Sequence, residues 1–183
     1  MLQFRIFILL MLFAEGFFQM LLKKNYEVRF ISVDYTGGTD YIDVSKIRFL
    51  GRERLANGTV EMKKDFSDEL YSVSAESFID PNGDGNYKKL PMFIPRQPIC
   101  KAMESNWKYL DASLKYGVNS DFPAHLHPCP IPKGLYYVKN VSPKTDDWPV
   151  IMPRGFLKAV MTLYDEDKVA GTFEVVVQIS DLS

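Results

Sequence analysis

Two histidines, His125 and His127, are separated by a single residue, and Cys129 follows shortly after them. Alternate residues of an extended segment point the same way, and imidazole and thiolate are the ligands that zinc prefers. No third ligand follows at a readable spacing, and a cysteine in a disulfide cannot bind a metal. No nucleophile elbow, phosphate-binding glycine loop or paired carboxylates accompany these histidines. We therefore expect the protein to bind no metal or cofactor and not to be an enzyme. An active site assembled from distant residues is the less favoured alternative.

A second segment resembles the start of a calcium-binding loop. Asp80, Asn82 and Asp84, followed by Gly85, copy the first positions of an EF-hand. The twelfth position, which must supply a bidentate glutamate, is Pro91, and two lysines precede it. Because Asp, Asn and Gly favour tight turns, we expect this segment to be a turn between two strands.

The composition predicts one globular domain rich in β structure. The chain has 183 residues, 46% of them hydrophobic and 14% aromatic, with 22 basic and 23 acidic side chains. This length is that of one domain with a sizeable core, and aromatic side chains pack well on sheets. The balanced charge lacks the basic footprint of a nucleic-acid binder, so we expect no nucleic acid as a partner.

The first residues are typical of a secretory signal. Arg5 precedes an uncharged apolar run, and small residues follow it at positions 14 and 16. The run is shorter than the roughly 20 residues of a membrane-spanning helix, which disfavours a membrane anchor. We expect a signal peptide at 1–16, with an uncertain cut site, and a single secreted domain at 17–183.

Export favours a disulfide between the two cysteines, Cys100 and Cys129, over two buried thiols. The sequence also has a glycosylation motif at Asn57, which we expect in a hairpin turn and glycosylated. A second motif at Asn140 is followed by Pro143, which disfavours its use.

Alternating apolar residues and turn signals predict a meander of strands along the first half of the chain. We expect strands within 26–35, 41–55, 59–62 and 70–79. The segment 122–132 contains four prolines and is not expected to be a central strand.

A single amphipathic helix is predicted at about 99–116. Met103, Trp107, Leu110 and Leu114 follow helical spacing, and Gly117 is placed to end the helix. This face is expected to pack on a sheet.

The segment 156–179 predicts a hairpin whose turn is 165–168. Alternate residues of each arm share one face. The inward residues are expected to be Leu157, Ala159, Met161 and Leu163 on the first arm, and Phe173, Val175, Val177 and Ile179 on the second. They can fill the core of a β-sandwich or line a ligand site, and the pattern alone favours the core.

The segment 129–137, Cys-Pro-Ile-Pro-Lys-Gly-Leu-Tyr-Tyr, followed by Trp148-Pro149 and by Met-Pro-Arg-Gly at 152–155, carries a family resemblance. The chain resembles an insect-expanded family of small secreted proteins that includes the chemosensory CheB proteins. It is more distantly similar to the ganglioside GM2 activator and to lipid-recognition domains.

This resemblance implies an immunoglobulin-like β-sandwich or β-cup that binds an apolar small molecule or a lipid without catalysis or cofactor. An extracellular receptor or a membrane surface would be a further partner. The candidate ligand-lining residues are Trp107, Leu157, Met161, Leu163, Phe173, Val175 and Val177. The alternative is an extracellular protein-interaction domain with a filled core.

Overall fold

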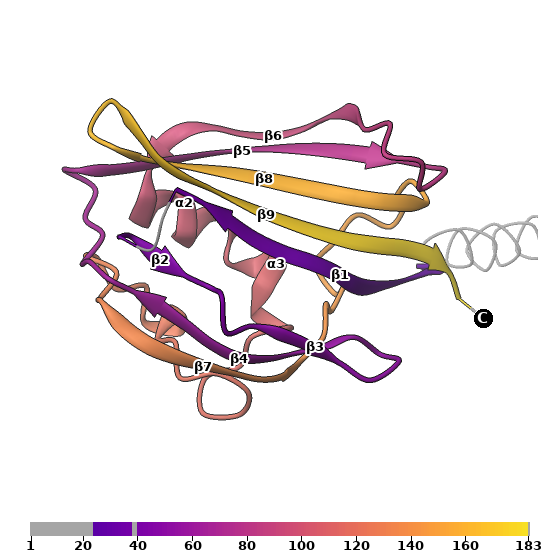
Figure 1. Ribbon diagram of the computed structural model, residues 1–183, viewed down its shortest axis with the longest axis horizontal. Helices are drawn as coiled ribbons and strands as arrows, with labels where there is room; N and C mark the ends of the chain where they lie inside the picture. The colour runs from indigo at the N-terminus through magenta and orange to yellow at the C-terminus, as the bar shows by residue number, and fades with distance from the viewer. Residues whose placement is uncertain (1–23, 38–39, 183) are drawn as a thin grey trace, which may run out of the picture.

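A computed structural model describes residues 24–37 and 40–182, which form two antiparallel sheets and a short helical segment (Figure 1). The predicted mainly β fold is therefore confirmed. The predicted signal peptide at 1–16 lies outside the described residues, as do residues 17–23 of the predicted domain. Within the described chain, no helix is long and apolar enough to cross a membrane.

The larger sheet has five strands in the order β1-β9-β8-β5-β6. Its strands are β1 (Tyr26–Thr36), β5 (Tyr71–Asp80), β6 (Lys88–Pro98), β8 (Gly155–Asp165) and β9 (Lys168–Asp181). The hairpin predicted at 156–179 is confirmed as β8 and β9, with Asp165 paired to Lys168 across the turn. The two ends of the described chain meet here, since β1 pairs with β9 along its length.

The smaller sheet is built around β4 (Leu55–Met62), with β7 (Gly134–Val141) on one edge. Its other edge carries two short strands, β2 (Ile42–Asp43) and β3 (Arg48–Leu50). The expectation of one meander, with a strand through 41–55, is therefore wrong. The strand breaks between β2 and β3, and β1 pairs with β9 instead of its neighbour in sequence, because the larger sheet takes strands from both halves of the chain.

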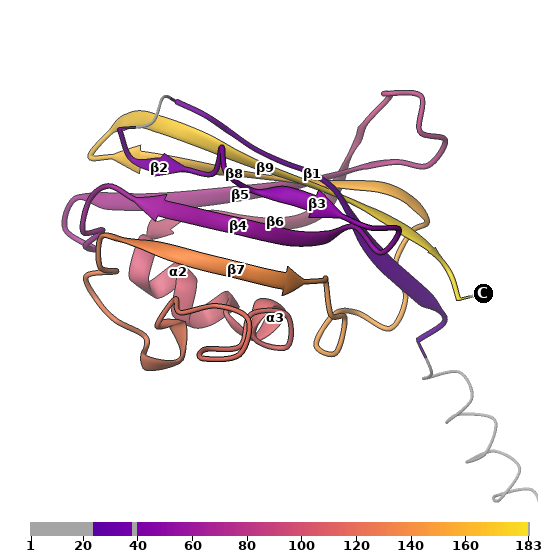
Figure 2. The same ribbon diagram turned by 60° about the horizontal axis from the view of Figure 1, so that its bottom comes forward.

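The predicted helix at 99–116 is shorter than expected and divided. It forms α2 (Ile99–Asn106) and α3 (Lys108–Asp111), with helical backbone angles at Trp107 between them. Gly117 has a left-handed backbone, but it does not end the helix, because the last helical residue is already Asp111. The side chain of Asn119 closes the turns that follow: it accepts a hydrogen bond from the Lys115 amide at 2.7 Å and donates one to the Ser113 carbonyl at 2.9 Å. The two helices lie together at one side of the sandwich (Figure 2).

The segment after β5 is a turn, as predicted. Asp80 is buried, and its carboxylate accepts hydrogen bonds from the amides of Asn82, Gly83 and Gly85 at 3.1, 2.8 and 2.7 Å. Burial raises the pKa of this carboxyl, but the amide hydrogen bonds outweigh burial and hold the pKa below its usual value. The proline-rich segment contains a 3-10 turn, η1 (Ala124–Leu126), and one isolated bridge at Ile131, which confirms that it is not a central strand.

Asn57 does not lie in a hairpin turn, so that expectation is wrong. It lies within β4 opposite Arg48, because the chain turns earlier, where Gly51 and Arg54 adopt left-handed backbone angles. The Asn57 side chain accepts a hydrogen bond from the Asn140 amide at 2.9 Å. Gly58 is required beside it, since a Cβ atom there would meet the Lys46 carbonyl oxygen at 2.2 Å.

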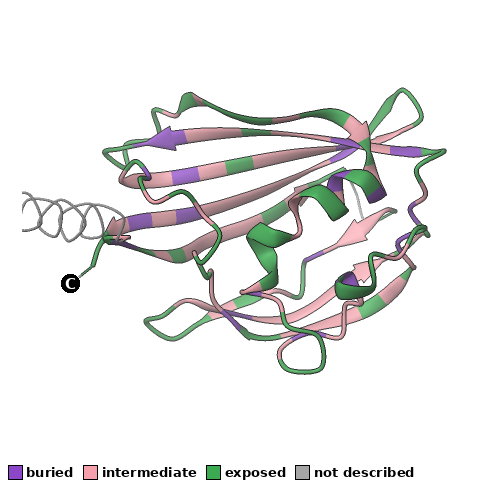
Figure 3. Cartoon of the chain, turned by 180° about the vertical axis from the view of Figure 1, so that it is seen from behind, coloured by how far each residue is buried: buried purple, intermediate pink, exposed green. Residues whose placement is uncertain are grey.

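The core consists of two clusters near opposite ends of the larger sheet (Figure 3). The first joins the start of β5 to the end of β8 and includes Phe66, Tyr71 and Leu163. The second joins the end of β5 to the start of β8 and includes Leu157 and Ile179. The middle of the sheet is therefore less closely covered than its ends.

One polar contact joins the two sheets beside the first cluster. The hydroxyl of Tyr41, next to β2, donates a hydrogen bond to the Asp165 carboxylate at 2.8 Å. This bond, followed by burial and by the charge of Asp165, raises the pKa of Tyr41 to about 12. Lys64 stands over the Tyr41 ring, 4.1 Å from its centroid.

We predict that this contact stabilises the fold up to about pH 10 and that the stabilisation is lost between pH 10 and about 12. The folded pKa lies above the unfolded one, so the folded state binds the phenolic proton more tightly. Tyr41→Phe should remove this part of the pH dependence, measured as the free energy of unfolding in urea from pH 8 to 12. Asp165→Asn is the matched control and should lower the Tyr41 pKa in an ultraviolet titration. Identical pH profiles for Tyr41→Phe and the parent would contradict the prediction.

Candidate functional site

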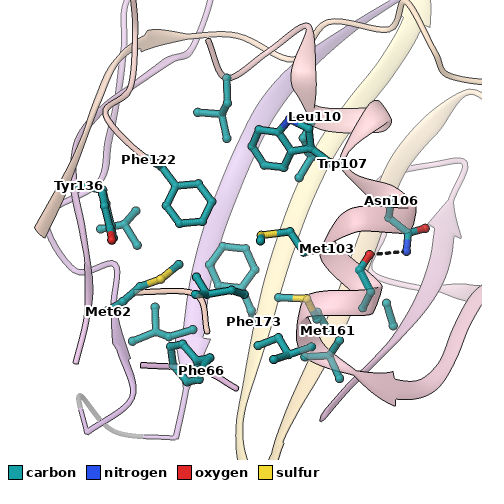
Figure 4. Close-up of a pocket in the computed structure, with 18 of the residues that line it drawn as sticks. Met62, Phe66, Met103, Asn106, Trp107, Leu110, Phe122, Tyr136, Met161 and Phe173 are labelled. Atoms are coloured by element: carbon teal, nitrogen blue, oxygen red, sulfur yellow. Dashed lines mark hydrogen bonds between the residues drawn. The ribbon is translucent and has the colours of Figure 1, made fainter. Parts of the chain in front are cut away.

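A cavity of about 400 Å³ lies between the two sheets and the helical segment (Figure 4). Its lining is almost entirely aliphatic, aromatic and methionine side chains. The size falls within the range of about 300 to 1,000 Å³ that is usual for small-ligand pockets. This cavity is the candidate functional site.

The larger sheet supplies one wall through a single row of paired residues. Ile94 pairs with Ala75, Ala75 with Met161, and Met161 with Phe173, so the row crosses β6, β5, β8 and β9. All four residues line the cavity. Directly paired residues point to the same face of a sheet, which explains why one row forms the wall.

The smaller sheet supplies the opposite wall. Val60 of β4 pairs with Tyr136 of β7, and Met62 and Val138 complete this surface. Figure 4 shows Met62, Phe122 and Tyr136 on one side of the cavity, facing the helix that carries Met103. Phe122 packs edge-on against Tyr136, with 5.1 Å between ring centroids.

The helical segment covers the cavity with the face predicted from its spacing. Met103, Trp107, Leu110 and Leu114 all line the cavity, although Leu114 lies beyond the end of α3. The predicted disulfide is confirmed: Cys100 at the start of α2 is bonded to Cys129, with 5.7 Å between their Cα atoms. The disulfide fixes the helix to the segment that leads into β7.

The cavity contains few polar groups. The Tyr136 hydroxyl donates to the Pro132 carbonyl at 2.8 Å, and the Trp107 indole donates to Asp111 at 3.1 Å. Burial, followed by the charges of Asp121 and Asp65, raises the pKa of Tyr136 and keeps its phenol neutral. Apart from Tyr136, the polar side chains of the described lining are Ser74, Asn106, Trp107 and Ser120.

The predicted candidate residues separate into two groups. Trp107, Met161 and Phe173 meet in the cavity. Leu163 is buried in the first core cluster, whereas Leu157, Val177 and Val175 belong to the second cluster. The alternation along β8 and β9 identified the inward face, but it did not indicate which part of that face lies against the cavity.

The other residues that line the cavity were not among the candidates predicted from the sequence. Met103, Leu110 and Leu114 carried a readable signal, because their helical spacing placed them beside Trp107. The residues of β4 and β7 carried none, since their approach to the helix depends on pairings between distant segments.

The two histidines lie outside the cavity lining. His125 is exposed and packs against Tyr116, with 4.5 Å between ring centroids. Among the described residues, the cluster with the composition of a metal site is Asp68 with Cys100 and Cys129. Both sulfur atoms of that cluster are in the disulfide, so they are not metal ligands.

Fold and site together define a β-sandwich of two sheets that encloses an apolar cavity. A family model described as "Protein of unknown function (DUF1091)" matches residues 73–159. This range runs from β5 into β8 and includes the helical segment, both cysteines and the 129–137 motif. No curated protein matches the chain.

The difference between core and cavity positions gives a stability prediction. Leu163→Ala should lower the free energy of unfolding by about 2–5 kcal/mol, because it leaves a void in a closely packed cluster. Met161→Ala should cost less, since the Met161 side chain already borders open space. Urea midpoints of the two variants and the parent measure the difference. Equal losses at both positions would show that the site around Met161 is filled.

Proposed function

We propose that this protein is an extracellular, non-catalytic binder or carrier of a small hydrophobic ligand. The observation that carries the proposal is the cavity of about 400 Å³ with its apolar lining. Removing an alkyl chain from water contributes about 0.8 kcal/mol per buried methylene, so such a cavity binds an apolar molecule without any catalytic group.

The lining is suited to ligands of varied shape. Met62, Met103 and Met161 reach the cavity from β4, α2 and β8 respectively. Methionine is unbranched and has three rotatable bonds, so it adapts to irregular surfaces. Three such side chains on three walls favour a class of apolar ligands over one rigid molecule.

The extracellular location is supported by several independent features. Disulfides persist in oxidising compartments, and this chain has one. The sequence at 1–16 has the pattern of a secretory signal, and the motif at 129–137 resembles secreted chemosensory and lipid-recognition proteins.

The second candidate is an extracellular protein-interaction domain. Val118, Leu126 and Ile151 are large apolar side chains with exposed fractions of 70%, 68% and 86%, and such side chains mark a contact surface where they lie together. This alternative assumes a filled core, and the cavity opposes that assumption. Ligand retention therefore distinguishes the two candidates.

We predict that delipidated protein, incubated with a mixture of lipids and apolar volatiles, retains a bound molecule in native mass spectrometry. Ala75→Phe should abolish retention, because Ala75 lies at the centre of the cavity wall. Val138→Phe should do the same from the opposite sheet. Glu76→Phe is the matched control, since the neighbouring side chain on a strand points to the opposite face and Glu76 pairs with Lys89 at the surface.

Retention by Glu76→Phe and the parent, but by neither cavity variant, is the expected pattern. A parent protein that retains nothing from the mixture would overturn the carrier proposal and favour the interaction domain.

Passage through a eukaryotic secretory pathway gives a further prediction. Protein secreted from such cells should carry a glycan at Asn57, and Asn57→Gln should remove one glycan-sized mass step. Asn140→Gln is the control and should leave the mass pattern unchanged, because Pro143 disfavours that motif. An unchanged mass for Asn57→Gln would show that the half-buried Asn57 is not modified.

A further inference from the structure

We propose that the cavity selects electrically neutral ligands and discriminates against their carboxylate analogues. This inference rests on the proposed function and narrows it to a chemical class: hydrocarbons, esters, alcohols and other uncharged apolar molecules.

The described lining offers no charge that would compensate a carboxylate. Among the described residues that line the cavity, none is Lys, Arg, His, Asp or Glu. Transferring a carboxylate into apolar surroundings is strongly unfavourable unless a cation or several hydrogen-bond donors receive it. An ester or an alcohol of the same chain length does not carry this penalty.

The main hydrogen-bond donors of the lining are already bonded within the protein. Trp107 donates its indole N–H to Asp111, and Asn106 donates from Nδ2 to the Ala102 carbonyl at 2.7 Å. The Tyr136 hydroxyl donates to a main-chain carbonyl as well. A carboxylate accepts hydrogen bonds and donates none, so these groups must break existing bonds to receive it.

The two serines of the lining do not change this balance. Ser74 Oγ lies 3.3 Å from the Tyr164 hydroxyl, and Ser120 Oγ accepts a hydrogen bond from the Phe122 amide at 3.2 Å. An isolated hydroxyl can bond to a neutral ligand oxygen, but it does not neutralise a full negative charge.

Carboxylates lie beside the lining at two places. Asp111 accepts the hydrogen bond of the Trp107 indole, and Asp65 and Asp121 accept hydrogen bonds from the amides of Lys133 and Tyr137, each at 2.7 Å. Burial raises the pKa of the Tyr136 phenol, and the charges of Asp121 and Asp65 also contribute to that raised pKa. Negative charge beside the helical segment and beside β7 disfavours an anionic head group there.

The test compares dodecanoate, methyl dodecanoate and dodecan-1-ol as competitors of the neutral probe N-phenyl-1-naphthylamine at pH 7.5, below their micelle concentrations. The ester and the alcohol should displace the probe with similar affinities, and dodecanoate should bind at least about thirtyfold more weakly. Binding of dodecanoate within about threefold of the ester would overturn the selection for neutral ligands and leave the carrier proposal intact. Failure of the probe and of all three compounds to bind would overturn both.

A charge variant tests the physical cause. Leu110 lines the cavity and is 48% exposed, so a lysine there is tolerated and places a cation at its edge. Leu110→Lys should raise the ratio of dodecanoate affinity to ester affinity about tenfold. Asn106→Lys tests the same effect from α2 if Leu110→Lys folds poorly. Ser105→Lys, on the exposed side of α2, should leave the ratio unchanged; an equal rise in this control would assign the effect to net charge and overturn the inference.

Discussion

The disulfide between Cys100 and Cys129 determines how the cavity is covered. Cys100 is the second residue of α2, and its amide donates a hydrogen bond to Asp68 at 2.7 Å. Cys129 precedes Ile131, whose amide and carbonyl pair with Phe66. One covalent link thus holds the start of the helix, the approach to β7 and the segment before β5 in one place. Without the disulfide, the position of the helical segment would depend on the apolar contacts that its inner face makes around a partly open cavity.

One face of the larger sheet both packs against the core and borders the cavity. Its ends form compact clusters around Leu163 and Leu157, which contribute the packing on which stability depends. Its middle row, with Met161, borders the cavity and forgoes part of that packing, because atoms beside a void lack contacts on one side. A ligand bound there would restore those contacts and stabilise the folded state through binding. Because core packing and the cavity wall lie on different parts of this face, the cavity can stay open while the sandwich remains folded.

Local sequence patterns correctly predicted the elements that depend only on residues close together in the sequence or on residue counts. The hairpin at 156–179, the turn after Asp80 and the pairing of the two cysteines each follow from alternation, turn chemistry or an even cysteine count. The turn near Asn57 was misplaced, because Asn-Gly is a strong hairpin signal and the bulge that this pair forms in β4 depends on its partner β7. Gly117 was wrongly expected to end the helix, since α3 already ends at Asp111 and turns follow it.

Whether an apolar face packs against side chains or borders a ligand cavity is a different kind of question, and no periodicity answers it. Met161 and Leu163 occupy equivalent positions in the alternation of β8, yet one lines the cavity and the other is core. The difference is one of burial: Leu163 is 3% exposed inside the first cluster, whereas Met161 packs against that cluster on one side and borders the cavity on the other. The walls opposite Met161 come from β4, β7 and the helical segment, which the pairing of β4 with β7 and the disulfide bring together from distant parts of the sequence. The charge of the lining, by contrast, depends only on residue types once the walls are known, so the proposed preference for neutral ligands follows from the composition of those walls.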